Sequence, residues 1–335
     1  MNVAIVGATG AVGQEFLAVL EQRRFPVSRL ILIASQRSAG RELTFAGHPV
    51  RVEPLAPERF DEVQVAFFSA GRSVSREYAP LAVRRGAIVI DNSSAFRMQP
   101  DVPLVVPEIN AGTMHGHRGI ISVPNCTAII LCMAIWPLHR ISRIARIVVS
   151  TYQAVSGAGA RALTELHDQT VEALRGRSPE PRVLPHPIAF NLFSHNTPIA
   201  ENGYNDEENK VMEETRKIMG APDLPITATC IRVPIPRAHS ESINLTFTDA
   251  LSEEQARAAL AAAPGVRLVD DRAANRFPMP IEASGGDDVL VGRIRRDLSQ
   301  PNGTGLALFA CGDQLRKGAA LNGVQIAEAL LAQRG

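Results

Sequence analysis

A short apolar run, a glycine-rich loop and a helix-like segment follow one another at the start of the chain, and this order constrains the fold most. Residues 3–7 read VAIVG, residues 7–13 read GATGAVG, and the segment GQEFLAVLEQR carries apolar residues at helical spacing. The apolar runs LILIAS, VAFFSAG and AIVIDNSS follow, with helix-like segments such as SREYAPLAVRRG between the later ones. Buried strands that alternate with helices predict a doubly wound parallel sheet.

The glycine loop between the first strand and the first helix has the form GxxGxxG, with glycines at 7, 10 and 13. Glycines in this place allow a tight turn and let the backbone approach a pyrophosphate at the helix N-terminus. We therefore expect a dinucleotide-binding domain of the Rossmann type. A purely structural strand–helix turn is the alternative that the loop alone leaves open.

The end of the second predicted strand bears on the choice of cofactor. An NAD site usually has an acidic residue there to hold the ribose 2′-hydroxyl, whereas this chain reads SQRSAG, with no carboxylate before Glu42. Arg37 can pair with a 2′-phosphate and the hydroxyl of Ser38 can donate to it, so we expect NADP. The alternative is a solvated loop arginine.

Composition narrows the class of protein. The chain has 335 residues, enough for about two domains, and 45% of them are apolar. Because 35 basic residues balance 34 acidic ones, neither nucleic acid nor an anionic membrane is expected as a partner. None of the four cysteines forms a CxxC pair and no His/Cys cluster has zinc spacing, so no metal site is expected. Without a signal peptide or a membrane-length apolar run, we expect a cytoplasmic protein with free thiols.

The pattern changes after about residue 145. ARIVVSTYQAVSG predicts a strand, GARALTELHDQTVEALRGR a long amphipathic helix, and SPEPRVLPHPIAFNLFSHNTP an ordered, proline-rich loop. DEENKVMEETRKIMG predicts a helix capped by Asp206 and ended by Gly220. ATCIRVPIPRAHSESINLTF contains two strands whose prolines favour edge positions or bends, and RKGAALNGVQIAEALLAQ predicts a closing helix.

Cys126 stands at the front of the apolar run CTAIILCMAIWPL, directly after Asn125. A cysteine here is either a small core residue or a nucleophile, because thiols at helix N-termini have lowered pKa values. From these residues alone both interpretations stay open.

Ten segments together resemble the bacterial aspartate-β-semialdehyde dehydrogenase family over nearly the whole chain. They are VGATGAVG, SQRSAG, DNSSAFRM, VPEIN, PNCT, TYQAVSGAG, DEENK, RVPIPRAHSESIN, PMPIEASGGDDVLVGRIRRD and RKGAALNGVQIAE. The resemblance implies NADPH-dependent, reversible reductive dephosphorylation of aspartyl-4-phosphate to aspartate semialdehyde, the branch step toward lysine, methionine and threonine. It also implies a homodimer. The expected domains are a Rossmann-type, NADP-binding α/β domain (1–127 and 315–335) and an α+β catalytic and dimerisation domain with a mixed sheet (128–314).

The resemblance also implies residue roles. Cys126 becomes the nucleophile that forms an acyl-thioester, His239 the acid/base and Gln153 the group that orients the substrate, with Asn125 assisting. Arg232 holds the substrate α-carboxylate and Glu207 faces the α-amino group. Arg97 and Lys210 hold the phosphate. The implied cofactor contacts are Gly7, Thr9, Gly10, Ala11, Val12, Gly13, Arg37, Ser38, Ser156, Gly157 and Asn322.

These roles agree with the chemistry. A dianionic leaving group needs cations, and an arginine fork and a lysine both suit phosphate. Glu207 and Lys210 stand three residues apart, so one helical face can present both. The spacing of Arg232 and His239 does not by itself bring them together. The backbone N–H of Cys126 and the side-chain amide of Asn125 are expected to hold the oxyanion.

The chain departs from the family's usual residues at Thr127 (commonly serine), Asn209 (commonly large or aromatic), Gln314 (frequently asparagine) and Gly323 (usually alanine). Cys132, Cys230 and Cys311 fit no motif and are expected to be buried structural thiols. Two alternative functions stay open. One is a catalytically silent paralogue that acts as a binding or scaffold protein, and the other is a related reductase of N-acetylglutamyl phosphate.

Overall fold

The computed structural model describes residues 1–332, which divide into two compact units. The first comprises Met1–Asn125 together with the chain from Gly318 onward, and the second comprises Cys126–Lys317. The sequence placed these boundaries at 127/128 and 314/315.

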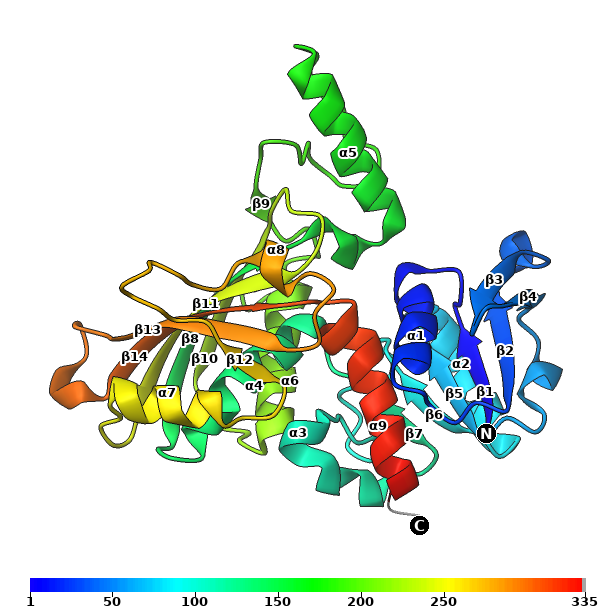
Figure 1. Ribbon diagram of the computed structural model, residues 1–335, viewed down its shortest axis with the longest axis horizontal. Coiled ribbons are helices and arrows are strands. Elements are labelled where there is room, and N and C mark those ends of the chain that lie inside the picture. The colour runs from blue at the N-terminus through cyan, green and yellow to red at the C-terminus, as the bar shows by residue number, and fades with distance from the viewer. Residues whose placement is uncertain (333–335) are drawn as a thin grey trace. The chain divides into compact units, whose positions relative to one another are not determined.

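The first unit is built on a seven-stranded sheet with the order β3-β4-β2-β1-β5-β6-β7 (Figure 1). Its inner strands are parallel, with Val3 opposite Leu30 on one side and Val65 on the other. The strands are β1 (Asn2–Val6), β2 (Arg29–Ala34), β3 (Glu42–Phe45), β4 (His48–Pro54), β5 (Val65–Phe68), β6 (Ile88–Asp91) and β7 (Ile120–Ser122).

Helices flank this sheet and complete the Rossmann-type unit. They are α1 (Ala11–Gln22), α2 (Arg72–Arg84), α3 (Pro107–Asn110) and α9 (Leu321–Ala332), with 3-10 turns at Gln36–Ser38, Pro57–Phe60 and Ala111–Gly116. Although α9 comes from the far end of the chain, it runs beside α1 and contacts β6 (Figure 1). The predicted parallel α/β architecture is confirmed.

The second unit contains a mixed seven-stranded sheet with the order β12-β13-β14-β11-β8-β10-β9. Its strands are β8 (Ile144–Gln153), β9 (Phe193–Ser194), β10 (Ile226–Arg232), β11 (His239–Phe247), β12 (Val266–Leu268), β13 (Val289–Arg296) and β14 (Gly305–Gly312). β8 pairs parallel with β10 and antiparallel with β11, so the mixed sheet expected from the sequence is confirmed.

Helices α4 (Cys126–His139) and α6 (Asp206–Met219) pack against each other and against this sheet, and α7 (Glu253–Ala261) contacts α4 and β13. The other helical segments are α5 (Ala160–Leu174), α8 (Pro280–Ala283), the 3-10 turns Val155–Ala158 and Pro301–Gly303, and a π-helical turn at Arg316–Ala320. Ten of the fourteen residues of α4 are buried, which explains its nearly unbroken apolar sequence.

One local prediction was wrong. The N-cap of α6 is Asn205 and not Asp206: the Asn205 side chain accepts from the Glu208 N–H, and the Glu208 carboxylate accepts from the Asn205 N–H. For the prolines of RVPIPRAH the sequence left edge positions or bends open, and the bends are confirmed: Pro234 and Pro236 lie at bends in the connection between β10 and β11, which are both inner strands.

Candidate active site

The glycine loop of the first unit has the geometry that a dinucleotide requires. Gly7 has a φ of +88°, and a Cβ there would lie 2.8 Å from the backbone of Ser69. A Cβ at Gly13 would overlap the carbonyl oxygen of Gly7, so only glycine lets α1 pack this closely onto the loop. Gly10 precedes α1 and brings no side chain that would compete with an anion for the first-turn N–H groups.

The other cofactor candidates of the first unit lie in different settings. Arg37 and Ser38 belong to the 3-10 turn that follows β2, and the Arg37 side chain is exposed. Thr9, Ala11 and Val12 belong to the loop or to the first turn of α1. Asn322 is fully buried in α9 and its side-chain amide donates to the carbonyl of Val105 over 2.8 Å, so it fixes α9 to the segment before α3.

Arg97 follows β6 and is buried in the first unit. Its Nε donates to the carbonyl of Val123 over 3.0 Å and its Nη2 to the carbonyl of Asn92 over 2.9 Å. These bonds fix the plane of the guanidinium group.

Cys126 is the first residue of α4, as the sequence predicted, and its side chain is only partly buried. The other three thiols are buried, and burial raises the pKa of each, that of Cys311 to about 12. Cys126 Sγ lies 4.0 Å from the hydroxyl of Thr127. The chain therefore has one accessible thiol at a helix N-terminus and three inert ones.

Gln153, the last residue of β8, joins the start of α4 to the start of α6. Its Nε2 donates to the Thr127 hydroxyl over 2.6 Å and to Glu207 Oε1 over 3.1 Å, while its Oε1 is buried without a hydrogen bond to any described residue. Lys210 Nζ lies 3.5 Å from Glu207 Oε2, so the predicted pair on one helical face is confirmed. The departure at Thr127 keeps the hydroxyl that Gln153 uses.

The capping box of α6 gives Glu207 a defined position. Asn205 and Glu208 close the box, and Glu208 Oε1 also accepts from the Cys230 N–H over 3.0 Å, which ties the first turn of α6 to β10. Asn209 accepts from Asn202 over 2.9 Å, so this departure from the family's usual residue holds the loop before the helix.

Arg232 and His239 meet at the turn that follows Gln153, which their spacing alone did not predict. Arg232 Nη1 donates to the carbonyl of Ala154 over 2.7 Å, and the Ala154 N–H donates to His239 Nδ1 over 3.0 Å. A Cβ on Gly157 would lie 3.4 Å from both Arg232 Nη1 and His239 Nε2, so this glycine lies directly against the pair.

The protonation state of His239 follows from these contacts. Burial and the neighbouring Arg232 lower the pKa of His239 to about 3, so the ring is neutral near pH 7. Because Nδ1 accepts a backbone hydrogen bond, the ring proton is on Nε2. His239 therefore presents a donor on the side where Gly157 lies.

His195 lies beside the cluster formed by Cys126, Gln153, Glu207, Arg232 and His239, and the sequence analysis did not single it out. It follows β9 in the proline-rich segment 178–198, which we call the strap, and its Nε2 lies 2.7 Å from Arg232 Nη2. No sequence motif marks it. The only available signal was that a histidine occurs in an ordered loop that precedes a predicted site helix.

Two further departures have structural roles. Gln314 donates to the hydroxyl of Ser156 and accepts from the Ala238 N–H over 2.8 Å, so it anchors the turn Val155–Ala158. A Cβ on Gly323 would lie 2.9 Å from the ring of Phe16, which explains why α9 can pack so closely on α1 with glycine at this position.

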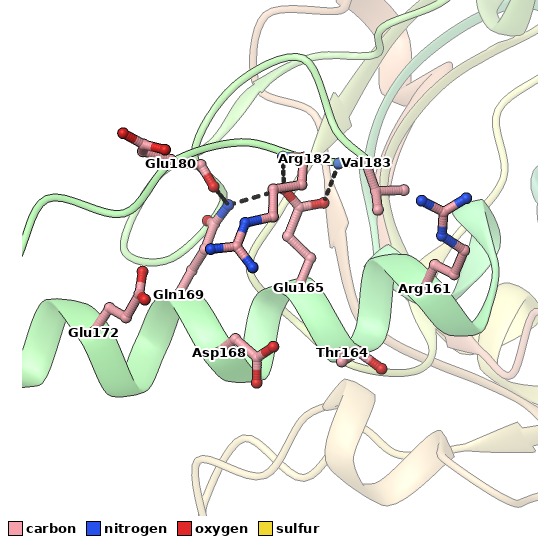
Figure 2. Close-up of a pocket in the computed structure, with 9 residues that line it drawn as sticks. All are labelled: Arg161, Thr164, Glu165, Asp168, Gln169, Glu172, Glu180, Arg182 and Val183. Carbon is pink, nitrogen blue, oxygen red and sulfur yellow. Dashed lines mark hydrogen bonds between the residues drawn. The ribbon is translucent and has the colours of Figure 1, made fainter.

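A pocket of about 250 Å³ lies along α5 and shares no residue with this cluster (Figure 2). Figure 2 shows Glu165 and Gln169 of α5 reaching the strap. Glu165 accepts from the N–H groups of Val183 and Leu184 over 2.9 Å, and Gln169 accepts from that of Ile188 over 2.7 Å. These contacts hold the strap against α5.

Two features are absent from residues 1–332. No group of three His, Cys, Asp or Glu side chains there is arranged to hold a metal ion. None of the helices in that range is both long and apolar enough to cross a bilayer.

Comparison with known proteins agrees with this geometry. Residues 2–117 match the family described as "Semialdehyde dehydrogenase, NAD binding domain", and residues 135–317 match "Semialdehyde dehydrogenase, dimerisation domain". An aspartate-semialdehyde dehydrogenase of Synechocystis is 54% identical over 335 residues, covering 100% of this chain and 98% of that protein. One of Bacillus subtilis is 48% identical, covering 98% and 97%.

A solved structure is also similar to this chain along nearly its whole length. Aspartate semialdehyde dehydrogenase II of Vibrio cholerae, solved also in complex with ASA, superposes with a TM-score of 0.94 at 41% identity and covers 99% of this chain and 98% of that one. Since both units match along their lengths and Cys126, Gln153, Arg232 and His239 are all in place, this chain belongs to the aspartate-semialdehyde dehydrogenase family.

Proposed function

We propose that the chain reduces L-aspartyl-4-phosphate to L-aspartate 4-semialdehyde and phosphate, reversibly, through a thioester on Cys126. The observation that carries this proposal is the cluster in the second unit. There the accessible Cys126 thiol lies 4.0 Å from the Thr127 hydroxyl, which accepts a hydrogen bond from Gln153, and Gln153, Glu207, Arg232 and His239 are all buried. Two polar atoms of this cluster, Arg232 Nε and Gln153 Oε1, are buried without a hydrogen bond to any described residue.

The unpaired atoms suit a zwitterionic amino acid. Arg232 has further N–H groups beyond those bonded to Ala154 and His195, which can take a carboxylate with two parallel hydrogen bonds. Glu207 is an anion, and Gln153 Oε1 an acceptor, for the α-ammonium group. A substrate held in this way extends its 4-carbonyl group away from its α-carbon, and we propose that Cys126 receives that carbonyl.

In the proposed first step the Cys126 thiolate attacks the acyl carbon, the bond to the phosphate oxygen breaks, and phosphate leaves with the electron pair. The backbone N–H of Cys126 and the amide of Asn125 are proposed to hold the oxyanion. Arg97 and Lys210 are proposed to bind the leaving phosphate, because a preoriented guanidinium group and an ammonium group both suit a dianion.

The cofactor fits the first unit, since a Cβ on Gly7 would meet the backbone of Ser69 and a Cβ on Gly13 would meet the carbonyl of Gly7, so glycine at both positions permits the tight strand–helix turn of a pyrophosphate-binding loop. The proposed contacts are the glycine loop, Arg37, Ser38, Ser156, Gly157 and Asn322. When bound, NADPH supplies the hydride that reduces the thioester. His239 is proposed to donate a hydrogen bond from its Nε2–H group to the substrate oxygen as the hydride adds to the thioester. Collapse of the resulting tetrahedral oxyanion then re-forms the carbonyl group, breaks the C–S bond and releases Cys126 as thiolate.

The preference for NADP rests on the end of β2, where Arg37 and Ser38 occupy the turn that bears a carboxylate in NAD sites. A homodimer is proposed because residues 135–317 match a family domain described as a dimerisation domain. Free thiols at all four cysteines support a reducing, cytoplasmic location.

Neither alternative function is favoured. A catalytically silent paralogue would not need the accessible Cys126 to adjoin Gln153 through Thr127. The substrate of an N-acetylglutamyl-phosphate reductase has an acylated amine, which carries no positive charge that the buried Glu207 carboxylate could bind.

The test is phosphate-dependent reduction of NADP with each semialdehyde in turn. We expect turnover with aspartate semialdehyde and at most a trace with N-acetylglutamate semialdehyde. Turnover with neither substrate would favour the catalytically silent paralogue. A preference for the acetylated substrate would make the chain an N-acetylglutamyl-phosphate reductase. Neutralising Arg97 or Lys210 is expected to raise the KM for phosphate and to leave that for NADP nearly unchanged.

A further inference from the structure

Backbone hydrogen bonds hold the end of the strap against β10 and so place His195 beside Arg232. Phe193 and Ser194 form β9, with Phe193 opposite Arg232 in the ladder. The His195 N–H donates to the carbonyl of Cys230 over 2.8 Å, and its own carbonyl accepts from Asn205 over 3.4 Å. The ring of His195 therefore stands in a fixed place beside the end of β10.

The second ring nitrogen has a partner that sets the tautomer. His195 Nδ1 lies 3.4 Å from the hydroxyl of Thr197, which accepts from the Glu207 N–H over 3.1 Å and donates to Asn205 Oδ1. With its hydroxyl proton directed to Asn205, Thr197 receives the proton of His195 Nδ1. The lone pair of His195 then lies on Nε2 and faces Arg232.

The ring stays neutral in this setting. Burial lowers the pKa of His195 to about 4, with Arg232 and Lys210 acting in the same direction and Glu207 opposing them. His239 is the other titratable neighbour, and it too is neutral near pH 7. A neutral acceptor beside a guanidinium group gives a charge-assisted hydrogen bond without a competing ion pair.

We propose that His195 is a positioning residue for Arg232. Ala154 holds Nη1 and His195 holds Nη2, so two bonds on different atoms fix the guanidinium plane. An acceptor that is neutral leaves the positive charge of Arg232 uncompensated at this edge. Arg232 then presents its remaining N–H groups, with full charge, to the α-carboxylate of the substrate. This role rests on the proposed function, because it presumes that Arg232 binds that carboxylate.

The variants His195→Ala and His195→Gln separate this role from a structural one. Alanine removes the acceptor, whereas the glutamine side-chain oxygen can reach the place of Nε2 and accept from Arg232. We expect His195→Ala to raise the KM for aspartate semialdehyde about tenfold or more, the scale of a lost bond to a charged group, and to leave the KM for NADP within about twofold. His195→Gln should recover most of the loss. His186→Ala is the matched control, since His186 lies in the same strap and its ring packs edge-on against the ring of Phe193.

A double-mutant cycle gives the decisive readout. In the Arg232→Ala background, His195→Ala should lower kcat/KM by less than about threefold, because the group that His195 positions is gone. Thermal melts of each variant identify any loss of folding. An equal loss in both backgrounds, or a glutamine variant no better than alanine, would overturn the assignment while wild-type activity upheld the proposed function. A wild-type chain inactive on aspartate semialdehyde would reject the proposed function itself and the role of His195 with it.

Discussion

Single residues differ in how far the sequence could identify them. The helix-start position of Cys126 was predictable because Cys126 opens an apolar run directly after Asn125, whereas its role as nucleophile came from the family resemblance at PNCT. His195 was not predictable, because its role depends on β9 pairing with β10, a contact across 37 residues that no local pattern encodes. The neutral state of His239 likewise depends on burial and on a backbone donor from a different strand end.

At neutral pH, one equivalent of iodoacetamide should modify Cys126 before the other thiols. The physical reason is that Cys126 is partly exposed at a helix N-terminus, whereas Cys132, Cys230 and Cys311 are buried with raised pKa values. Peptide mapping by mass spectrometry measures the order of labelling. Cys126→Ala is the control, and it should also abolish turnover while leaving the thermal melt and cofactor binding intact. Equal labelling of all four thiols would show that Cys126 is not activated.

Arg37→Ala should weaken NADP binding by about 1–3 kcal/mol, the scale of a charge-assisted hydrogen bond to a phosphate, and barely change NAD binding. Calorimetry with each cofactor measures this. Arg41, a nearby arginine beyond the turn Gln36–Ser38, provides the control variant Arg41→Ala. If the Arg37 change costs NAD and NADP alike, Arg37 does not contact the 2′-phosphate.

At the scale of elements, strands and helices with a strong apolar pattern were predicted correctly, whereas a hairpin without a recognisable turn sequence and the exact N-cap of a helix were not. The hairpin of β3 and β4 was missed because its turn residues are Ala46 and Gly47, both with positive φ, and alanine gives no signal for such a turn. Asp206 was mistaken for the cap because Asn205 and Asp206 are both good capping residues. Only the reciprocal bonds between Asn205 and Glu208 distinguish them.

Asn205→Ala and Ser252→Ala remove equivalent capping boxes, on α6 and α7 respectively. Each should lower the free energy of unfolding by about 0.5–2 kcal/mol, because each leaves first-turn N–H groups without their acceptor. Only Asn205→Ala should also raise the KM for aspartate semialdehyde, since α6 carries Glu207 in its first turn and α7 carries no residue of the cluster. Denaturant melts and steady-state kinetics measure the two effects. Equal KM values in the two variants would mean that the cap does not position Glu207.

At the scale of the whole chain, the order of apolar strands and helices predicted the parallel α/β unit, the family resemblance implied the mixed-sheet unit, and both are present. The strand order of the second sheet could not be predicted from the sequence, because β11 pairs with β8 and with β14 through residues that are far apart in the chain. That placement buries Glu241 of β11 completely, and neither of its carboxylate oxygens bonds to any described residue. Burial raises the pKa of Glu241 well above its ordinary value.

Glu241 should therefore make the stability of the chain depend on pH. Below the pKa that Glu241 has in the unfolded chain, its carboxyl group is protonated in both the folded and the unfolded state, so its ionisation does not affect the free energy of unfolding. As pH rises above that value the unfolded state ionises while the folded state keeps its proton, so stability falls until the pH reaches the raised folded pKa.

Glu241→Gln keeps the shape of the side chain and removes the titration. It should raise the Tm more at pH 8 than at pH 4.5, with roughly 2 °C for each kcal/mol in a chain of this size. Any effect of the unpaired amide itself is the same at both pH values, so thermal melts across the pH series isolate the ionisation. A Tm difference that does not change with pH would mean that Glu241 titrates alike in the folded and unfolded chains.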